Sequence, residues 1–191
     1  MFRKFIIPLS LVGLLVACGP TTKLEKSWAD PSLTASTIKA FTKILVVAPL
    51  KDEASKRIAE DKIAAQLKTG VAVQSYSYLL ATDTDQKLVE EKLKKDGFDG
   101  VILMRLKDVE KTTSYTPGTS YGGWYGYRYA SPGYVSTDKT FIVETNFYSL
   151  ASGKLLWSGT TSTLNPTTLD QSLDGIISTL KYELQRRGLV K

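Results

Sequence analysis

Apolar positions along the chain repeat with two different periods, and their alternation predicts a layered α/β fold. The run Lys43–Leu50 is almost continuously apolar, rich in β-branched residues and closed by Pro49, which is typical of a strand buried on both faces. Residues 52–69 then carry apolar side chains at helical spacing, with Gly70 placed to end the helix. Residues 71–75 have the pattern of a second short strand.

The same alternation continues through the middle of the chain. Residues 84–97 predict a second helix, for which Asp83 or Thr84 is the expected N-cap. Gly100–Lys107 predicts a third strand that starts fully apolar and then alternates, so we expect its far end to leave the covered part of the sheet.

The last third of the chain predicts a β-hairpin followed by a helix. Residues 141–148 alternate in polarity, residues 151–154 form a turn, and residues 155–158 begin the return strand. Thr168 and Gln171 have the spacing of a capping box for a final helix with an apolar stripe.

These elements predict one α/β domain over residues 43–191, in the order β-α-β-α-β-insert-β-β-α. The sheet is expected to be mixed, with about five strands and three helices, and the insert to cover residues 113–137. Right-handed crossovers place the first two helices either on one face or on both sides of the sheet.

Residues 1–17 have the anatomy of a secretory signal, with two basic residues before the apolar stretch Phe5–Val16. The segment Leu15–Cys18 resembles the lipobox of bacterial lipoproteins. This resemblance implies that Cys18 becomes the first residue of the mature protein and carries acyl chains on its sulfur and usually on its amine. Each buried acyl methylene contributes about 0.8 kcal/mol, so several chains give a permanent anchor.

The residues after the cysteine suggest where the anchor lies. Gly19 stands where many inner-membrane lipoproteins have Asp, so we expect the outer membrane, with the protein facing the periplasm. Residues 18–42 have no sustained apolar period and contain two prolines, which predicts a lipidated cysteine followed by a tether.

Composition narrows the chemistry that the chain can perform. Among its 191 residues there is no histidine, which removes the commonest general base and the usual zinc ligand. The only cysteine is expected to be acylated, which removes cysteine nucleophiles and thiolate metal sites as well. We therefore expect no enzyme activity, no cofactor and no metal. Removing Arg3 and Lys4 with the signal lowers the formal charge from +6 to +4. Such a mildly basic surface suits anionic lipids or polymers, whereas an exported chain seldom meets nucleic acid.

Two short motifs nevertheless match those of penicillin-binding enzymes. Ser36–Lys39 is S-x-x-K and Lys68–Gly70 is K-T-G, but no S-D-N element accompanies them. Asp52 and Asp99 are expected near the C-termini of strands, facing one crevice, where ligand sites of open α/β sheets form. Helix caps and turns explain both carboxylates better.

The insert over residues 113–137 is the most unusual segment, because it holds six of the ten tyrosines. It is either an adaptable loop or hairpin that covers a sheet edge, or a surface that contacts a protein partner or a glycan through rigid aromatic rings. The candidate contact residues are Tyr121, Trp124, Tyr125, Tyr127, Arg128 and Tyr129.

Three segments carry a family resemblance: the lipobox, the strand Phe98–Leu103, and the hairpin stretches Thr145–Tyr148 and Ser152–Gly159. With them the chain resembles uncharacterised bacterial lipoproteins that carry a domain of unknown function. Its element order is similar to the α/β domain of the curli secretion lipoprotein, the N-terminal domain of the Tol-system propeller protein, and lipoprotein activators of penicillin-binding proteins. The resemblance implies a non-enzymatic envelope protein that works through protein contacts.

The function that follows is a membrane-anchored envelope lipoprotein, held by acyl chains on Cys18, that serves as an accessory or scaffold protein. Its partner is expected to be an envelope protein bound through the insert. The alternative is a module that binds peptidoglycan or another glycan, with Trp124 stacking on sugar faces.

Overall fold

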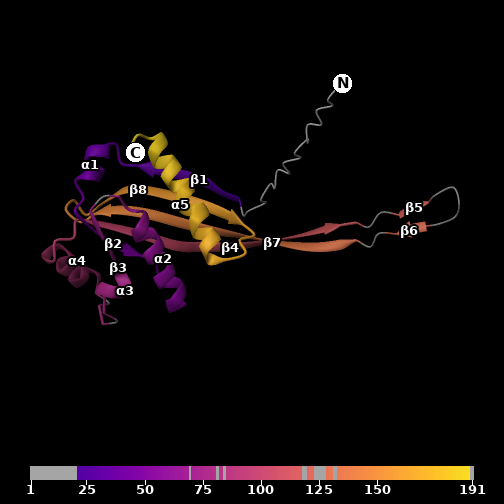
Figure 1. Ribbon diagram of the computed structural model, residues 1–191, viewed down its shortest axis with the longest axis horizontal. Coiled ribbons are helices and arrows are strands. Elements are labelled where there is room, and N and C mark those ends of the chain that lie inside the picture. Colours follow the sequence, from indigo (N-terminus) through magenta and orange to yellow (C-terminus); the bar gives the residue numbers. More distant parts are fainter. Residues whose placement is uncertain are drawn as a thin grey trace, which may run out of the picture.

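The computed structural model contains a six-stranded mixed sheet with helices on both faces (Figure 1). It describes residues 21–68, 70–80, 82–83, 85–117, 120–122, 128–130 and 133–189. The strand order is β1-β8-β7-β4-β2-β3, and β5 and β6 form a separate two-stranded ribbon. The strands are β1 (Thr21–Ala29), β2 (Lys43–Val47), β3 (Val71–Gln74), β4 (Gly100–Thr116), β5 (Ser120–Gly122), β6 (Arg128–Ala130), β7 (Tyr134–Ser149) and β8 (Lys154–Leu164). The helices are α1 (Ala35–Lys39), α2 (Glu53–Gln66), α3 (Ser75–Tyr78), α4 (Gln86–Lys95) and α5 (Leu169–Arg186). The prediction of a single α/β domain with a mixed sheet is confirmed.

Strand β2 lies in the middle of the parallel part of the sheet. It pairs in parallel with β3 on one side and with β4 on the other. Ile44, Leu45 and Val46 are at most 3% exposed, and successive residues belong to different apolar clusters. The continuous apolar run therefore marks a strand that is buried on both faces, as its sequence predicts.

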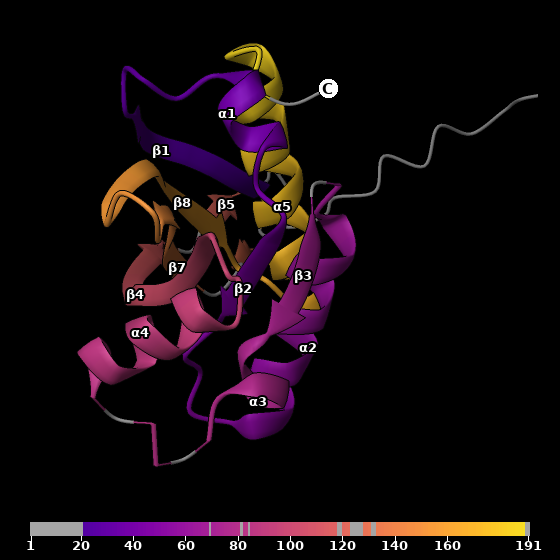
Figure 2. The same ribbon diagram turned by 90° about the vertical axis from the view of Figure 1, so that its left-hand side faces the viewer.

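The helices α2 and α4 lie on opposite faces of the sheet (Figure 2). The chain moves from β2 outward to β3 and then back past β2 to β4. Because each parallel crossover is right-handed, reversing the direction along the sheet places the second helix on the other face. This settles the choice that the sequence left open.

Helix α5 covers the same face as α2 and begins and ends at residues with defined contacts. Thr168 caps its N-terminus by accepting a hydrogen bond from the Gln171 amide, as predicted. Gly175 packs tightly on β1, since a Cβ there would lie 2.3 Å from Thr22 Oγ1. The C-terminal turn is held by buried Glu183, which accepts hydrogen bonds from Ser27 and from two arginines.

Three sequence predictions need correction. Residues 21–42 are not simply a tether, because they supply edge strand β1, paired with β8, and the short helix α1. Helix α4 is capped by Asp85, whereas Asp83 binds Lys92 and the Leu80 amide; Thr84 lies outside the described residues. Within the described residues, β1 and the short helices bring the sheet to six strands and the helices to five, against the expected five and three.

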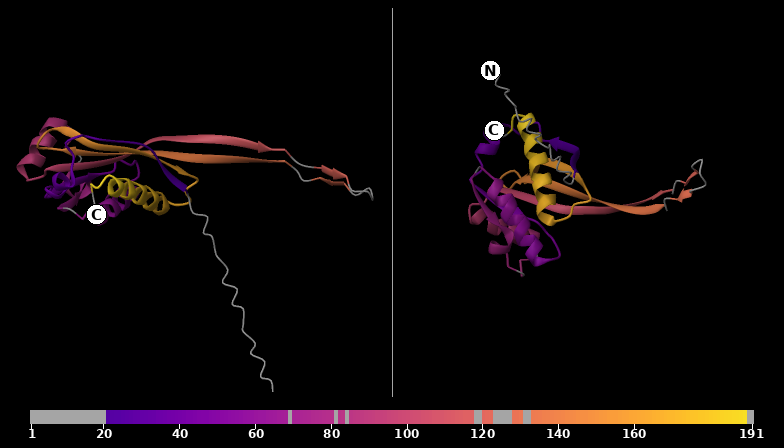
Figure 3. Two further views of the ribbon diagram at one scale, coloured as in Figure 1. Left: turned by 90° about the horizontal axis from the view of Figure 1, so that it is seen from above. Right: turned by 45° about the vertical axis from the view of Figure 1, so that its right-hand side comes forward.

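The predicted hairpin is confirmed as β7 and β8, whose turn contains Gly153 at φ 64°. Its partner β4 runs much further than expected, over 17 residues. A bulge between Leu106 and Asp108 shifts the pairing of β4 with β7. Beyond Lys111 and Lys139 the two strands leave the body of the molecule together (Figure 3).

Candidate functional site

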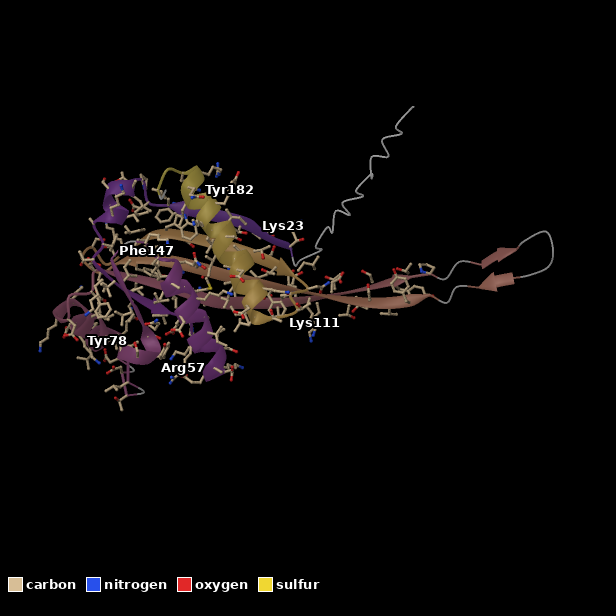
Figure 4. The ribbon with its side chains drawn as sticks, viewed as in Figure 1. Lys23, Arg57, Tyr78, Lys111, Phe147 and Tyr182 are labelled. Atoms are coloured by element: carbon tan, nitrogen blue, oxygen red, sulfur yellow. The ribbon has the colours of Figure 1, made fainter. Side chains whose placement is uncertain are left out.

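The outer parts of β4 and β7 form a projecting structure that we call the arm. Of its residues 111–139, the structure describes 111–117, 120–122, 128–130 and 133–139. The two strands stay paired in antiparallel register from Lys111 and Lys139 to Thr116 and Tyr134. Figure 4 labels Lys111 where the arm leaves the body, and Figure 1 shows β5 and β6 at its outer end. On the body side of Lys111, an ion pair joins β4 to β7, with Arg105 Nε 2.8 Å from Glu144 Oε2.

The arm has no neighbouring strand on either edge in the part of the chain that the structure describes. Strand β2 stops pairing with β4 at Leu103, and β8 stops pairing with β7 at Thr140. Asn165 closes the base by bonding the backbone of Lys139. Beyond it, the outward-facing N–H and C=O groups of both strands remain free to pair with another chain.

Both faces of the arm expose apolar side chains. Tyr115 and Val135 are directly paired and therefore share one face, and they are 67% and 64% exposed. Tyr134, paired with Thr116 on the other face, is 63% exposed. A two-stranded hairpin without a covered face is only marginally stable in water. The exposed side chains of the arm therefore do not belong to either apolar cluster of the body.

The structure treats the predicted contact residues in two ways. Tyr121 in β5 pairs with Tyr129 in β6, and Arg128 pairs with Gly122, so the backbone brings three candidates together. The other candidates, Trp124, Tyr125 and Tyr127, lie outside the described residues, as does Cys18.

Sequence reasoning missed Tyr115, Tyr134 and Val135 as candidate contact residues. Tyr115 and Tyr134 belong to the aromatic enrichment of the insert, but they lie outside its Gly-rich centre, from which the candidates come. Their positions could have indicated their role, because one tyrosine lies near each end of the insert, where the two strands of a hairpin pair.

The two carboxylates that could have formed a catalytic pair do not converge. Asp52 follows β2 and caps α2, and hydrogen bonds from Ser55 hold its pKa below the ordinary value. Asp99 lies at the other end of β2, where it accepts hydrogen bonds from Thr42 and Lys43. Each carboxylate therefore has the capping or turn role that its sequence context favours.

Glu60 is the buried acid nearest to the carboxyl ends of β2 and β3. It is fully buried and accepts hydrogen bonds from the Ala48 amide, the Ser75 hydroxyl and the Tyr76 amide. These bonds tie α2 to two strand ends, so its oxygens serve the fold. Within the described ranges, no group of three or more His, Cys, Asp or Glu side chains is placed to hold a metal ion.

The penicillin-binding motifs are likewise parts of ordinary secondary structure. The S-x-x-K motif spans the short helix α1, where Ser36 lies within hydrogen-bond distance of the N-cap Thr34. The K-T-G motif follows α2. Its Gly70 has φ 64°, and a Cβ there would lie 2.6 Å from the Thr42 carbonyl oxygen, so both the backbone conformation and the close approach require glycine.

Comparison with known proteins gives distant matches only. No protein-family model matches the sequence, and no curated protein matches it. The chain is similar to the PelC dodecamer from Paraburkholderia phytofirmans, at 12% identity and a TM-score of 0.44, over 83% of this chain and 96% of that one. It is also similar to lipoprotein GNA1162 from Neisseria meningitidis, at 13% identity and a TM-score of 0.44, over 76% of this chain and 99% of that one. A PDZ domain protein from Parabacteroides distasonis is similar at 11% sequence identity and a TM-score of 0.34, over 85% of this chain and 35% of that one. One distant structural neighbour is therefore a bacterial lipoprotein.

No helix in the described part of the chain has the length and apolar character needed to cross a membrane.

Proposed function

We propose that this protein is a lipid-anchored accessory or scaffold protein of the bacterial envelope, and that it binds a protein partner through the arm. Acyl chains on Cys18 hold it at the outer membrane, facing the periplasm. The observation that carries the proposal is the arm itself, whose open strand edges and exposed rings have no role within the domain.

The arm offers a partner two kinds of contact. Its unpaired backbone edges can accept an added strand, which supplies main-chain hydrogen bonds. Its exposed rings, Tyr115 and Tyr134, bury large apolar area at low entropic cost and keep a hydroxyl for hydrogen bonding. Both rings lie on strands that continue into the core, so the body positions them.

Site-specific photo-cross-linking in living cells tests this proposal. A photoreactive amino acid is placed at Tyr115 or Val135 in the arm and, as a control, at Tyr182 on α5 (Figure 4). Tyr182 is 69% exposed and Tyr115 is 67% exposed, so both sites are equally accessible to random collisions. We expect a discrete protein adduct from the arm positions only. The same adducts from Tyr182, or none from the arm, would contradict the proposal.

An arm-less variant provides the matched deletion. Replacing residues 112–138 with Asn-Gly joins Lys111 to Lys139, which already face each other, through a two-residue turn that suits a hairpin. This variant should stay folded and anchored while losing the partner. Cell fractionation with and without Cys18→Ala tests the anchor, because the unacylated chain should leave the membrane fraction.

The glycan alternative has its own measurement. Co-sedimentation with purified peptidoglycan, compared between the full chain and Trp124→Ala, would reveal sugar binding through the insert. Binding that requires Trp124 would favour the alternative over a protein partner.

A further inference from the structure

Two lysines face each other at the base of the arm (Figure 4). Lys111 in β4 is directly paired with Lys139 in β7, so their side chains lie on the same face of the arm. Both residues are exposed, and neither forms an ion pair within the part of the chain that the structure describes. Like charges directly opposite each other destabilise a pair of strands. The lysine pair therefore concentrates positive charge that no ion pair of the described chain compensates.

The backbone beside this pair is closed on the β7 side and open on the β4 side. Asn165 accepts a hydrogen bond from the Lys139 amide through Oδ1, and its own amide donates to the Lys139 carbonyl oxygen. Both backbone groups of Lys139 thus point away from β4, so those of the directly opposite Lys111 point away from β7. Among the described residues, the outward groups of Lys111 have no partner, because β2 stops pairing with β4 at Leu103. An added strand therefore meets an occupied edge beside Lys139 and an open edge beside Lys111.

The open edge of β4 continues outward from the lysine pair. Every second residue of a strand turns its backbone groups to the same side, so Thr113 and Tyr115 also present N–H and C=O groups on this edge. Nearer the body, the Val109 amide already donates a hydrogen bond to the Asp108 carboxylate. The open edge therefore begins at Lys111.

The opposite face of the arm base is acidic. Glu110 and Asp138 lie on that face, because each directly neighbours one of the paired lysines along its strand. Asp138 accepts a hydrogen bond from Asn165, whereas Glu110 is exposed next to the open edge. A strand added to β4 thus meets Lys111 on one face and Glu110 on the other.

We propose that the open edge of β4 binds an extended segment of another protein, and that this segment carries Asp or Glu beside Lys111. The segment adds a third strand to the arm, held by hydrogen bonds to the backbone of Lys111, Thr113 and Tyr115. Its carboxylate lies on the face of the lysine pair and offsets the two charges. The adjacent side chains of the segment point to the other face, toward Glu110, and are therefore not acidic. This inference rests on the proposed function, because it names the edge and the chemistry through which the arm binds its protein partner.

A matched pair of proline variants tests which edge is used. Thr113 and Thr137 are directly paired, and their amides point to opposite edges of the arm. Proline removes the amide N–H and is tolerated on a strand edge where that N–H faces solvent. The readout is the in-cell yield of the protein adduct from a photoreactive residue at Val135 of the full chain. Thr113→Pro should lower this yield about tenfold, whereas Thr137→Pro should leave it unchanged.

Charge reversal tests the acidic segment with the same readout. Lys111→Glu and Lys139→Glu should each lower the adduct yield about fivefold, because each removes an attraction and Lys111→Glu also adds a repulsion. The matched control is Lys87→Glu on α4, which changes an exposed lysine away from the arm and should change nothing. Mass spectrometry of the digested adduct should identify a partner peptide that contains Asp or Glu. Exchanging that acid for Lys should restore the adduct with Lys111→Glu.

Several results would overturn this inference alone. Equal yields from the two proline variants would remove the β4 edge as the binding edge, and an unchanged yield from Lys111→Glu would remove the acidic segment. An adduct of twice the mass of the chain would assign the edge to a second copy instead of another protein. No adduct from the unaltered arm would overturn the proposed function as well. If Thr113→Pro fails to fold, as judged by circular dichroism, the charge reversals decide.

Discussion

The inner and outer halves of β4 and β7 are the same pair of strands in two opposite environments. In the body, β4 lies between β2 and β7, and Met104 is 6% exposed. In the arm, the pair has no neighbouring strand, and Tyr115 is 67% exposed. The pairing of β4 with β7 therefore continues beyond the core, but a two-stranded hairpin without a core is only marginally stable. The body buries its apolar side chains, whereas the arm leaves those of Tyr115, Tyr134 and Val135 exposed.

The largest expected contrast is in backbone hydrogen exchange. Amides of β4 in the body should exchange only on global unfolding, whereas amides at residues 112–116 open locally at little cost. We expect protection to differ by at least a thousandfold, on the order of 4 kcal/mol. Mass spectrometry of exchanged peptides measures this. Equal protection along β4 would show that the arm is stabilised within this chain.

Side-chain truncation sharpens the same contrast within one strand. Met104→Ala should lower the free energy of unfolding by about 2–5 kcal/mol, because it removes buried apolar volume from the main cluster. Tyr115→Ala should change it by less than about 0.5 kcal/mol, since it contacts no core. Urea unfolding of both variants gives the comparison. A large loss from Tyr115→Ala would contradict our description of the arm.

Measuring the free energy of unfolding as a function of pH tests whether its pH dependence arises from ion pairs of the body rather than from the arm. Burial alone would raise the pKa of Glu183, but hydrogen bonds from Arg187, Ser27 and Arg186 outweigh it and hold this pKa below its usual value. The folded pKa is thus lower than the unfolded one, so the contribution is present above the unfolded pKa and is lost as pH falls through the folded pKa. Glu183→Gln should cost about 1.5–3 kcal/mol at pH 7 and flatten the acid dependence of stability below about pH 4. The arm-less variant should keep the wild-type pH profile.

The smallest effect is expected from removing the arm altogether. Replacing residues 112–138 with Asn-Gly deletes no residue of either apolar cluster. The free energy of unfolding should therefore change by less than about 1 kcal/mol. Chemical denaturation monitored by tryptophan fluorescence checks this. A loss of several kcal/mol would mean that the arm and the body fold as one unit.

The sequence predicts best those elements whose pattern is decided locally or by full burial. The apolar run of β2, the cap at Thr168 and the turn before β8 each depend on a few neighbouring residues, and the structure contains all three. Asp52 as a cap belongs to the same group.

Strand β1 escapes prediction because its inward positions are mostly small or polar. Three inward residues of β1 pack toward α5 or the main apolar cluster: Thr22, Leu24 and Ser27. Among them, Leu24 alone is a large apolar residue. A register shift between Leu24 and Lys26 also breaks the period of two. The arm escapes for a related reason, since strands without a core show no apolar alternation.

The entry point of the chain into the sheet has a consequence for where a partner can be met. Thr21 pairs with Leu164, which pairs with Thr140, so β1 begins beside the base of the arm (Figure 3). Only three peptide units separate Cys18 from Thr21, a reach of about 10 Å even when fully extended. With acyl chains on that sulfur, the bilayer surface and the root of the projection are close neighbours. Under the proposed acylation, a molecule that contacts the base of the arm therefore also stands at the membrane.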